Sequence, residues 1–203
     1  MANLDQQRSV ERQFRSVQPT QLRAGEADGK RTIETYFAVF GDVYEMWPGA
    51  TESFDARAFD GALSADVRCL TNHDPSKVLG RTKAGTLALS IDNYGLKGVV
   101  QINELDQDAM NLYARVQRGD VSQCSVGFDI LREDYRINAD GTQHWTILEV
   151  KLYEGSIVTF PAYEKTEAVA RSLRMAQSFE FWQKKMKERM HQWHSNSSCC
   201  EKD

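Results

Sequence analysis

The sequence has little of several features that mark specialised protein classes. Only four of its 203 residues are proline and 41% are hydrophobic, which excludes a collagen-like or low-complexity chain and predicts one folded core. It contains no run of about 18 apolar residues, and its first thirty residues hold no apolar stretch suited to secretion or membrane insertion. We therefore expect a soluble protein with no export signal and no membrane contact.

Motifs for nucleotides and metals are also missing. Neither the G-x-G-x-x-G pattern nor the G-x-x-x-x-G-K-[ST] pattern occurs, so nucleotide chemistry has no local support. The four cysteines form no C-x-x-C pair, and a reducing cytoplasm suits them best. His191 and His194, followed by Cys199 and Cys200, match no standard zinc spacing. We expect neither a cofactor nor a metal ion.

Charge is unevenly distributed along the chain. The net charge is −4, and residues 32–170 hold 21 acidic and 12 basic side chains, whereas both flanking segments are mildly basic. An acidic core is not typical of a nucleic-acid-binding protein. The lysines near the C-terminus are typical of the solvated face of a helix. We therefore expect no specific nucleic-acid partner.

The chain divides into three parts by composition. Residues 1–30 are polar, with turn-forming residues before any strand pattern, and predict a flexible N-terminal arm. Residues 31–170 contain the alternating patterns of a folded domain. Residues 171–203 predict a helical C-terminal tail, whose apolar stripe makes self-association an expectation.

Short β-type segments dominate the central part. Runs rich in β-branched and aromatic residues predict strands, and apolar residues three or four positions apart predict helices. The predicted strands are residues 32–40, 67–72, 77–82, 86–92, 95–102, 124–135 and 142–160. The predicted helices are residues 52–64, 106–118 and 166–193, the second starting after the N-cap Asp106 and stopping at Gly119. This pattern predicts a β-rich α+β fold, a small closed or nearly closed β-barrel flanked by helices.

Few residues could carry acid–base or nucleophilic chemistry. Among the four histidines, His73 lies where a predicted strand passes into a turn, and His144 lies in a strand with no nearby nucleophile in the sequence. Ser125 begins the segment SVGF, and Glu154 is a carboxylate in an otherwise apolar strand region, which is costly unless it is paired or solvated. A nucleophilic serine needs a base within reach and a third group that orients the base.

Three separated segments resemble the caudovirus prohead serine proteases, the peptidases that mature phage capsids, which are distantly similar to herpesvirus assemblin. The segments are TNHDPSKVLGRTKAGTLALSIDNYGL, RVQRGDVSQCSVGF and LYEGSIVTFPAYEKT. They resemble the family's Asn-His-Asp, Ser-x-Gly-Phe and Leu-x-Glu-x-Ser patterns, in the family's order. The resemblance covers roughly residues 31–170; Cys124 and Gly155 stand where related sequences often carry methionine and valine.

The resemblance implies a serine endopeptidase with His73 as general base, Ser125 as nucleophile and Glu154 as third member. It implies an assemblin-like barrel as the catalytic domain over residues 31–170. It also implies action inside the assembling procapsid, in the cytoplasm of a host bacterium. The implied substrates are the scaffold, the scaffolding segment of the major capsid protein, and the protease's own ends.

Alternatives remain open at this point. Glu149 and Asp134 lie in the same region as Glu154, and either could be the third member. A catalytically inactive capsid-assembly or scaffold protein could be built on the same barrel. A metal-dependent hydrolase that uses His73 with Asp74 is a third reading, although no second histidine stands nearby at ligand spacing.

Overall fold

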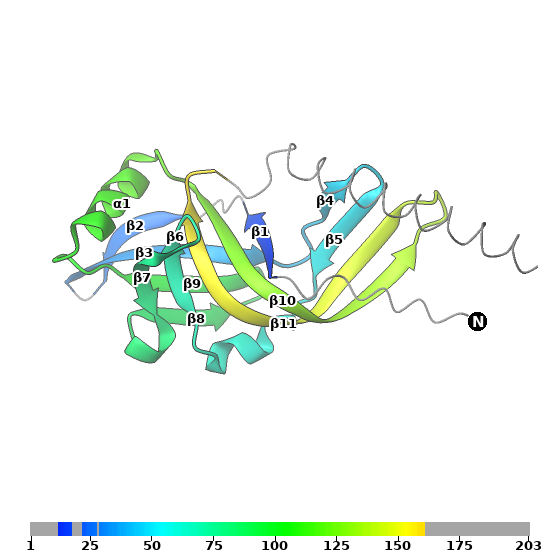
Figure 1. Ribbon diagram of the computed structural model, residues 1–203, viewed down its shortest axis with the longest axis horizontal. Helices are drawn as coiled ribbons and strands as arrows, with labels where there is room; N and C mark the ends of the chain where they lie inside the picture. Colours follow the sequence, from blue (N-terminus) through cyan, green and yellow to red (C-terminus); the bar gives the residue numbers. More distant parts are fainter. Residues whose placement is uncertain (1–11, 18–21, 28, 161–203) are drawn as a thin grey trace, which may run out of the picture. The chain divides into compact units, whose positions relative to one another are not determined.

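The computed structural model describes residues 12–17, 22–27 and 29–160, which form two β-sheets, one α-helix and two short 3-10 helices (Figure 1). Residues 161–203 lie outside the described residues, and with them the helix predicted at 166–193 and the tail predicted at 171–203. No helix in the described ranges is long and apolar enough to cross a membrane.

Two long antiparallel strands organise the seven-stranded sheet. They are β10 (Gln123–Ile137) and β11 (Gln143–Val158), joined by a turn in which Gly141 has a φ of 83°. The other strands of this sheet are β1 (Gln13–Val17), β4 (Tyr44–Trp47), β5 (Ala50–Phe54), β6 (Arg68–Thr71) and β7 (Asp74–Arg81). Strand β1 pairs with β10, whereas β5 and β6 both pair in parallel with β11, at its two ends.

The second sheet has four antiparallel strands in the order β2-β3-β9-β8. They are β2 (Arg23–Ala27), β3 (Lys30–Val39), β8 (Leu87–Ile91) and β9 (Gly95–Gln101). The β8–β9 turn is closed by Asp92, whose carboxylate accepts hydrogen bonds from the backbone N–H groups of Tyr94 and Gly95. Tyr36 of β3 also donates to Asp92, across 2.6 Å, and this bond raises the pKa of Tyr36 to about 12.

Helix α1 (Gln107–Arg118) begins and ends where the sequence predicts. The Asp106 carboxylate accepts hydrogen bonds from the backbone N–H groups of Asp108 and Ala109, which are otherwise unpaired at a helix start. Gly119 ends the helix at φ 89°, a left-handed conformation that glycine adopts at little cost. The short helices are η1 (Asp60–Ser64) and η2 (Thr82–Ala84).

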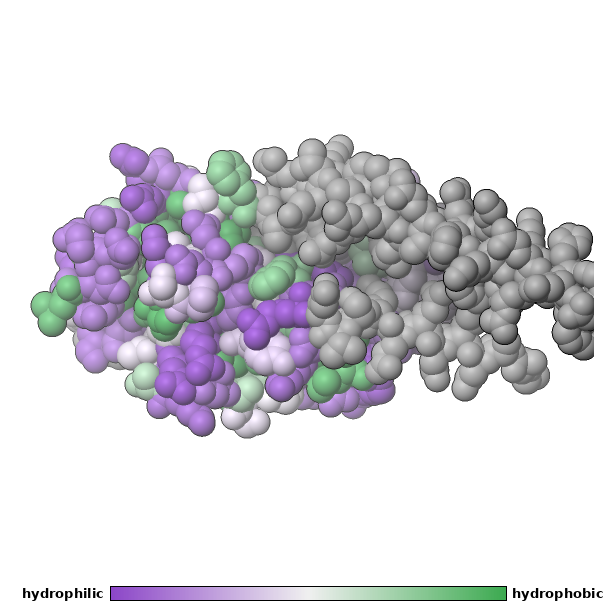
Figure 2. Space-filling view, viewed as in Figure 1, coloured by the Kyte–Doolittle hydropathy of each residue, from purple (hydrophilic) through white to green (hydrophobic). Residues whose placement is uncertain are grey.

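The core contains Phe37 of β3, Phe59 before η1 and Phe128 of β10, each at most 1% exposed. Phe37 packs directly on Gly155, where an added Cβ would lie 2.5 Å from the ring. The phenylalanine therefore fills the space that a larger residue at position 155 would need. Outside, the described part of one face is mainly hydrophilic, with isolated hydrophobic residues (Figure 2).

The predicted closed barrel flanked by helices is wrong. The described strands form open sheets, whose paired paths end at β1 and β4 in one case and at β2 and β8 in the other. A single α-helix accompanies them in the described ranges. The physical reason is that β11 is sixteen residues long and pairs in parallel with two separate strands, β5 and β6. Short strands in sequence predict a β-rich domain, but they do not predict such long-range parallel pairing.

The helix predicted at 52–64 is also wrong. Residues 50–54 form β5, in which Ala50, Glu52 and Phe54 are buried with the period of two that a strand has. Only Asp60–Ser64 is helical, as η1. The segment predicted as a flexible arm, residues 1–30, contains the strands β1 and β2. Both are held by pairing with strands distant in sequence or in the next segment, which composition does not reveal.

Candidate active site

His73 lies at the tip of the β6–β7 hairpin. Thr71 pairs with Asp74, so Asn72 and His73 form a two-residue loop, and both have positive φ, 52° and 60°. Such loops connect antiparallel strands well, but positive φ at a histidine costs about 1 kcal/mol or more relative to glycine. The tip is anchored on β11: Asn72 donates its backbone N–H to the Ile157 carbonyl, across 3.0 Å.

Glu154 of β11 holds the imidazole of His73. Its Oε1 lies 2.6 Å from Nδ1 of His73, and the carboxylate is 4% exposed at its side chain. Ser156 donates its hydroxyl hydrogen to Oε2 of Glu154 and accepts the backbone N–H of His73 across 3.3 Å. A carboxylate acceptor at Nδ1 places the proton on that nitrogen and leaves Nε2 as a hydrogen-bond acceptor.

Ser125 of β10 lies directly opposite Ser156 in the antiparallel pair of β10 with β11. Directly paired residues point to the same face of a sheet, and residues two apart on one strand do so as well. Ser125, Ser156 and Glu154 therefore share one face, the face that the His73 tip covers. Strand alternation thus brings together three side chains that the sequence spreads over residues 125–156.

Two buried polar atoms of this cluster have no hydrogen-bond partner among the described residues: Nε2 of His73 and Oγ of Ser125. Buried polar groups are normally satisfied, so unpaired ones mark a strained or functional site. An acceptor nitrogen oriented by a carboxylate, beside a serine hydroxyl, is the arrangement of a nucleophile with its base. No hydrogen bond joins the two atoms here, and in uncomplexed enzymes such contacts are often long.

Gly127 makes room for the carboxylate. It pairs with Glu154, and an added Cβ would lie 2.7 Å from Oε1 and 2.9 Å from Cγ of Glu154. The same Cβ would lie 3.1 Å from the ring of Phe14 on β1. Phe14 in turn meets the imidazole of His73 edge-on, with ring centroids 4.5 Å apart. The glycine of the SVGF segment is therefore part of the site's architecture.

The other acidic residues that the sequence offered lie elsewhere. Glu149 is half-exposed at its side chain and faces Arg132, and Asp134 is exposed. Asp74 follows His73 but binds the backbone N–H and the hydroxyl of Ser76, which lower the pKa of its carboxyl. Of these acidic side chains, Glu154 is the one that the structure places against His73.

Cys124, the neighbour of Ser125, is fully buried on the opposite face of β10. Burial raises the pKa of its thiol to about 12, and its sulfur lies 3.0 Å from Oγ1 of Thr35. A thiol with such a pKa carries almost no thiolate at neutral pH. Cys124 thus has the properties of a small core residue.

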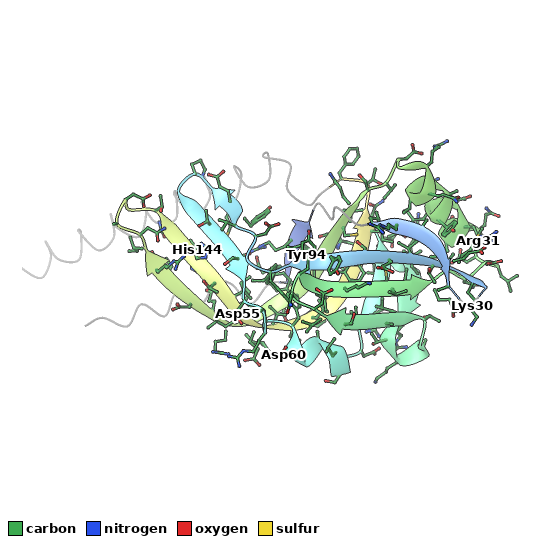
Figure 3. The ribbon with its side chains drawn as sticks, turned by 180° about the vertical axis from the view of Figure 1, so that it is seen from behind. Lys30, Arg31, Asp55, Asp60, Tyr94 and His144 are labelled. Carbon is green, nitrogen blue, oxygen red and sulfur yellow. The ribbon has the colours of Figure 1, made fainter. Side chains whose placement is uncertain are left out.

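A second histidine with serine and threonine neighbours lies on the extended part of β11. His144 is 5% exposed; its Nδ1 is 2.8 Å from Oγ1 of Thr51, and its Nε2 is 3.0 Å from Oγ of Ser53. Burial lowers the pKa of His144, with a further lowering from the charge of Arg136. Figure 3 shows His144 at the end of β11 that runs beside β5. Among the described residues no carboxylate is hydrogen-bonded to this ring, and both of its nitrogens lie within hydrogen-bond distance of a hydroxyl, so His144 is a satisfied buried histidine.

Comparison with known proteins finds a family match. Residues 18–179 match the model of the caudovirus prohead serine proteases, which is most of the chain. The chain belongs to the caudovirus prohead serine protease family. No curated protein and no solved structure matches it. The matched span contains His73, Ser125 and Glu154 but begins after β1.

Family membership indicates a serine protease of phage capsid maturation. Prohead proteases act within the procapsid, and capsid or scaffold proteins are their substrates. The described residues contain no group of three histidine, cysteine, aspartate or glutamate side chains placed to hold a metal ion. His191, His194, Cys199 and Cys200 lie outside the described residues.

Sequence reasoning missed two residues of the site. Ser156 stands two positions after Glu154, so strand alternation alone could have put it on the same face. Phe14 lies in the segment predicted to be a flexible arm, and nothing in the local sequence connects it with a histidine 59 positions later.

Proposed function

We propose that the protein is a serine endopeptidase in which Ser125 is the nucleophile and His73 the general base. Glu154 orients the imidazole of His73 and stabilises its protonated form. Its substrates are the scaffold or the scaffolding segment of the major capsid protein, and its own termini. The observation that carries the proposal is the bond between Nδ1 of His73 and Glu154, which leaves Nε2 unpaired in the same cluster as Ser125.

The chemistry proceeds in two halves. Nε2 of His73 takes the proton of Ser125 as Oγ attacks the scissile carbonyl, and Glu154 stabilises the imidazolium that forms. The imidazolium then gives its proton to the leaving amine, which leaves an acyl group on Ser125. His73 then takes a proton from a water molecule, which attacks the ester. The acyl group leaves as a carboxylic acid, and Oγ of Ser125 receives the proton back. Because Glu154 is 3% exposed, its attraction to the imidazolium is weakly screened.

Cleavage of a precursor tests the reaction class. The wild-type chain and Ser125→Ala are each incubated alone and with the capsid-protein precursor, and intact masses are recorded. We expect the wild type to trim the precursor, and the variant, which loses one hydroxyl, to fold normally and cut at least about a thousandfold more slowly. Equal cleavage by the two chains would remove Ser125 from the reaction.

A second candidate function is that of an inactive capsid-assembly protein on the same fold. One observation favours it: Ser125 is 0% exposed and makes no hydrogen bond to His73. In that case both chains leave the precursor whole while particles still assemble with normal yield. Assembly that fails without the wild-type chain and proceeds with Ser125→Ala would support this role.

A further inference from the structure

The nucleophile of the proposed site is closed off from solvent. Ser125 and Ser156 are 0% exposed, and Glu154 is 3% exposed. A peptide bond cannot reach Oγ of Ser125 in this state, because the scissile carbon must come within about 3–3.5 Å of the attacking atom. Some part of the protein must therefore move before an endopeptidase of this design can act.

Strand β1 is the element that flanks the nucleophile. It forms the outer edge of the seven-stranded sheet and pairs antiparallel with β10, with Phe14 opposite Gly127, Ser16 opposite Ser125 and Val17 opposite Cys124. Directly opposite residues in such a pair have Cα atoms about 4.5–5.5 Å apart. The backbone at Ser16 is thus a neighbouring peptide chain positioned beside Ser125, and the Phe14 ring lies against His73.

Two further contacts hold β1 in place. Arg15 is 3% exposed and forms a two-pronged ion pair with Glu52 of β5, which is 1% exposed; its Nη2 lies 2.9 Å from Oε2. Arg12, just before the strand, stacks over the ring of Tyr153, 4.1 Å from its centroid. The family match starts at residue 18, so these contacts come from residues in front of the matched region.

We propose that residues 13–17 occupy the place on the β10 edge into which an extended peptide substrate adds as an antiparallel strand, and that β1 keeps the protease closed until the substrate displaces it. Extended peptides commonly bind proteins by adding to an exposed sheet edge, with main-chain hydrogen bonds supplying affinity. The substrate residue that takes the place of Ser16 brings its peptide group beside Ser125. This inference rests on the proposed function.

A reversible bridge between β1 and β10 tests it in the full chain. Val17→Cys places a thiol opposite the native Cys124, at a Cα separation that a disulfide can span. Cys199 and Cys200 are replaced by serine to prevent competing bridges. Oxidised glutathione removes the two thiol hydrogens, mass spectrometry confirms the bridge, and dithiothreitol reopens it. The matched control is the same chain with Val17 kept, taken through the same cycle.

We expect the bridged chain to cleave the capsid-protein precursor at least tenfold more slowly than the reduced chain, with the control unchanged. Equal cleavage in the two redox states, while the control is active, would overturn the inference and leave the proposed function standing. If the bridge does not form, because the Cys124 thiol is buried and little ionised, the ion-pair variant described next decides the question. If the wild type itself never cleaves, the proposed function fails and the inference falls with it.

A loosened strand decides the question if the bridged chain does not fold. The double variant Arg15→Gln/Glu52→Gln removes both charges of this ion pair. We expect it to cleave at least threefold faster than the wild type. The control is Arg31→Gln/Glu104→Gln, which removes an ion pair that is partly exposed and does not involve β1. Cleavage that is unchanged in both double variants would contradict the inference.

Discussion

Two histidines of this protein lie beside serine hydroxyls, and their surroundings differ in one decisive respect. His73 has a carboxylate on Nδ1 and an unpaired Nε2, whereas His144 has Thr51 on Nδ1 and Ser53 on Nε2. Both nitrogens of His144 lie within hydrogen-bond distance of a hydroxyl, and no carboxylate among the described residues is bonded to the ring to stabilise an imidazolium. A histidine and a serine in contact therefore do not suffice; a carboxylate on Nδ1 distinguishes the candidate catalytic site.

Replacing each ring in turn gives the largest expected contrast. His73→Gln should reduce precursor cleavage by at least about a thousandfold, because no group remains to accept the Ser125 proton. His144→Gln should leave the rate within about threefold and lower the free energy of unfolding by about 1–2 kcal/mol through the loss of a buried hydrogen bond. Initial rates and denaturant melts measure both. Comparable losses of cleavage in the two variants would erase the distinction between the sites.

The partners of the two Nδ1 atoms can be compared in the same way. Glu154→Gln should slow cleavage by roughly 10- to 1000-fold, less than the loss of the serine, because an amide neither stabilises the imidazolium nor fixes the proton on Nδ1. Thr51→Val, which removes the corresponding partner of His144, should not change the rate. The readout is kcat/KM with the purified precursor. Wild-type activity in Glu154→Gln would take Glu154 out of the site.

A glycine tests how closely the site is packed. Gly127→Ala should reduce cleavage by about tenfold, since the added methyl group lies within 3 Å of the Glu154 carboxylate and must shift it. Gly61→Ala is the matched control, because an added Cβ there meets nothing within 4 Å and its φ is not in the left-handed region. The readout is the rate of precursor cleavage by both variants, and melting curves check that both variants fold. An unaffected Gly127→Ala would show that the carboxylate has room to spare.

The smallest effect concerns pH and belongs to His144. Burial lowers the pKa of this ring in the folded chain, so below the ordinary value of 6.5 the unfolded chain binds more protons. Titration of His144 therefore does not change the free energy of unfolding above that pH, and it lowers the free energy of unfolding as the pH falls below it. The melting temperature of the wild type should fall more between pH 7.5 and pH 5.5 than the melting temperature of His144→Gln. Identical losses would show that His144 titrates normally in the fold.

Part of this molecule could be predicted from local sequence. Helix α1 carries its own start and stop signals in Asp106 and Gly119, and short-range signals need no knowledge of the rest of the fold. Candidate residues His73, Ser125 and Glu154 came from motif resemblance, and the structure places His73 against Glu154 and Ser125 on the same face. Each of these residues lies in a short sequence motif, and the motifs follow one another in a definite order, so the sequence alone was enough to select them.

The rest depends on contacts distant in sequence. The contact between His73 and Glu154 joins residues 81 positions apart and requires the parallel pairing of β6 with β11. Likewise, Glu52 reads as part of an amphipathic helix until its burial opposite Arg15 of β1 is known. Residues 13–17 look like a polar arm because their partners lie on β10 and β5. Open sheets rather than a barrel follow from the same long-range pairing.

Covalent trapping of the nucleophile tests the central claim most directly. The wild-type chain, His73→Gln and His144→Gln are treated with a fluorophosphonate, which reacts with activated serines, and the modified peptide is identified by mass spectrometry. Our account predicts phosphonylation at Ser125 in the wild type and in His144→Gln, and at least a hundredfold slower reaction in His73→Gln. Modification at Ser53 in place of Ser125, or a rate at Ser125 that is independent of His73, would contradict it.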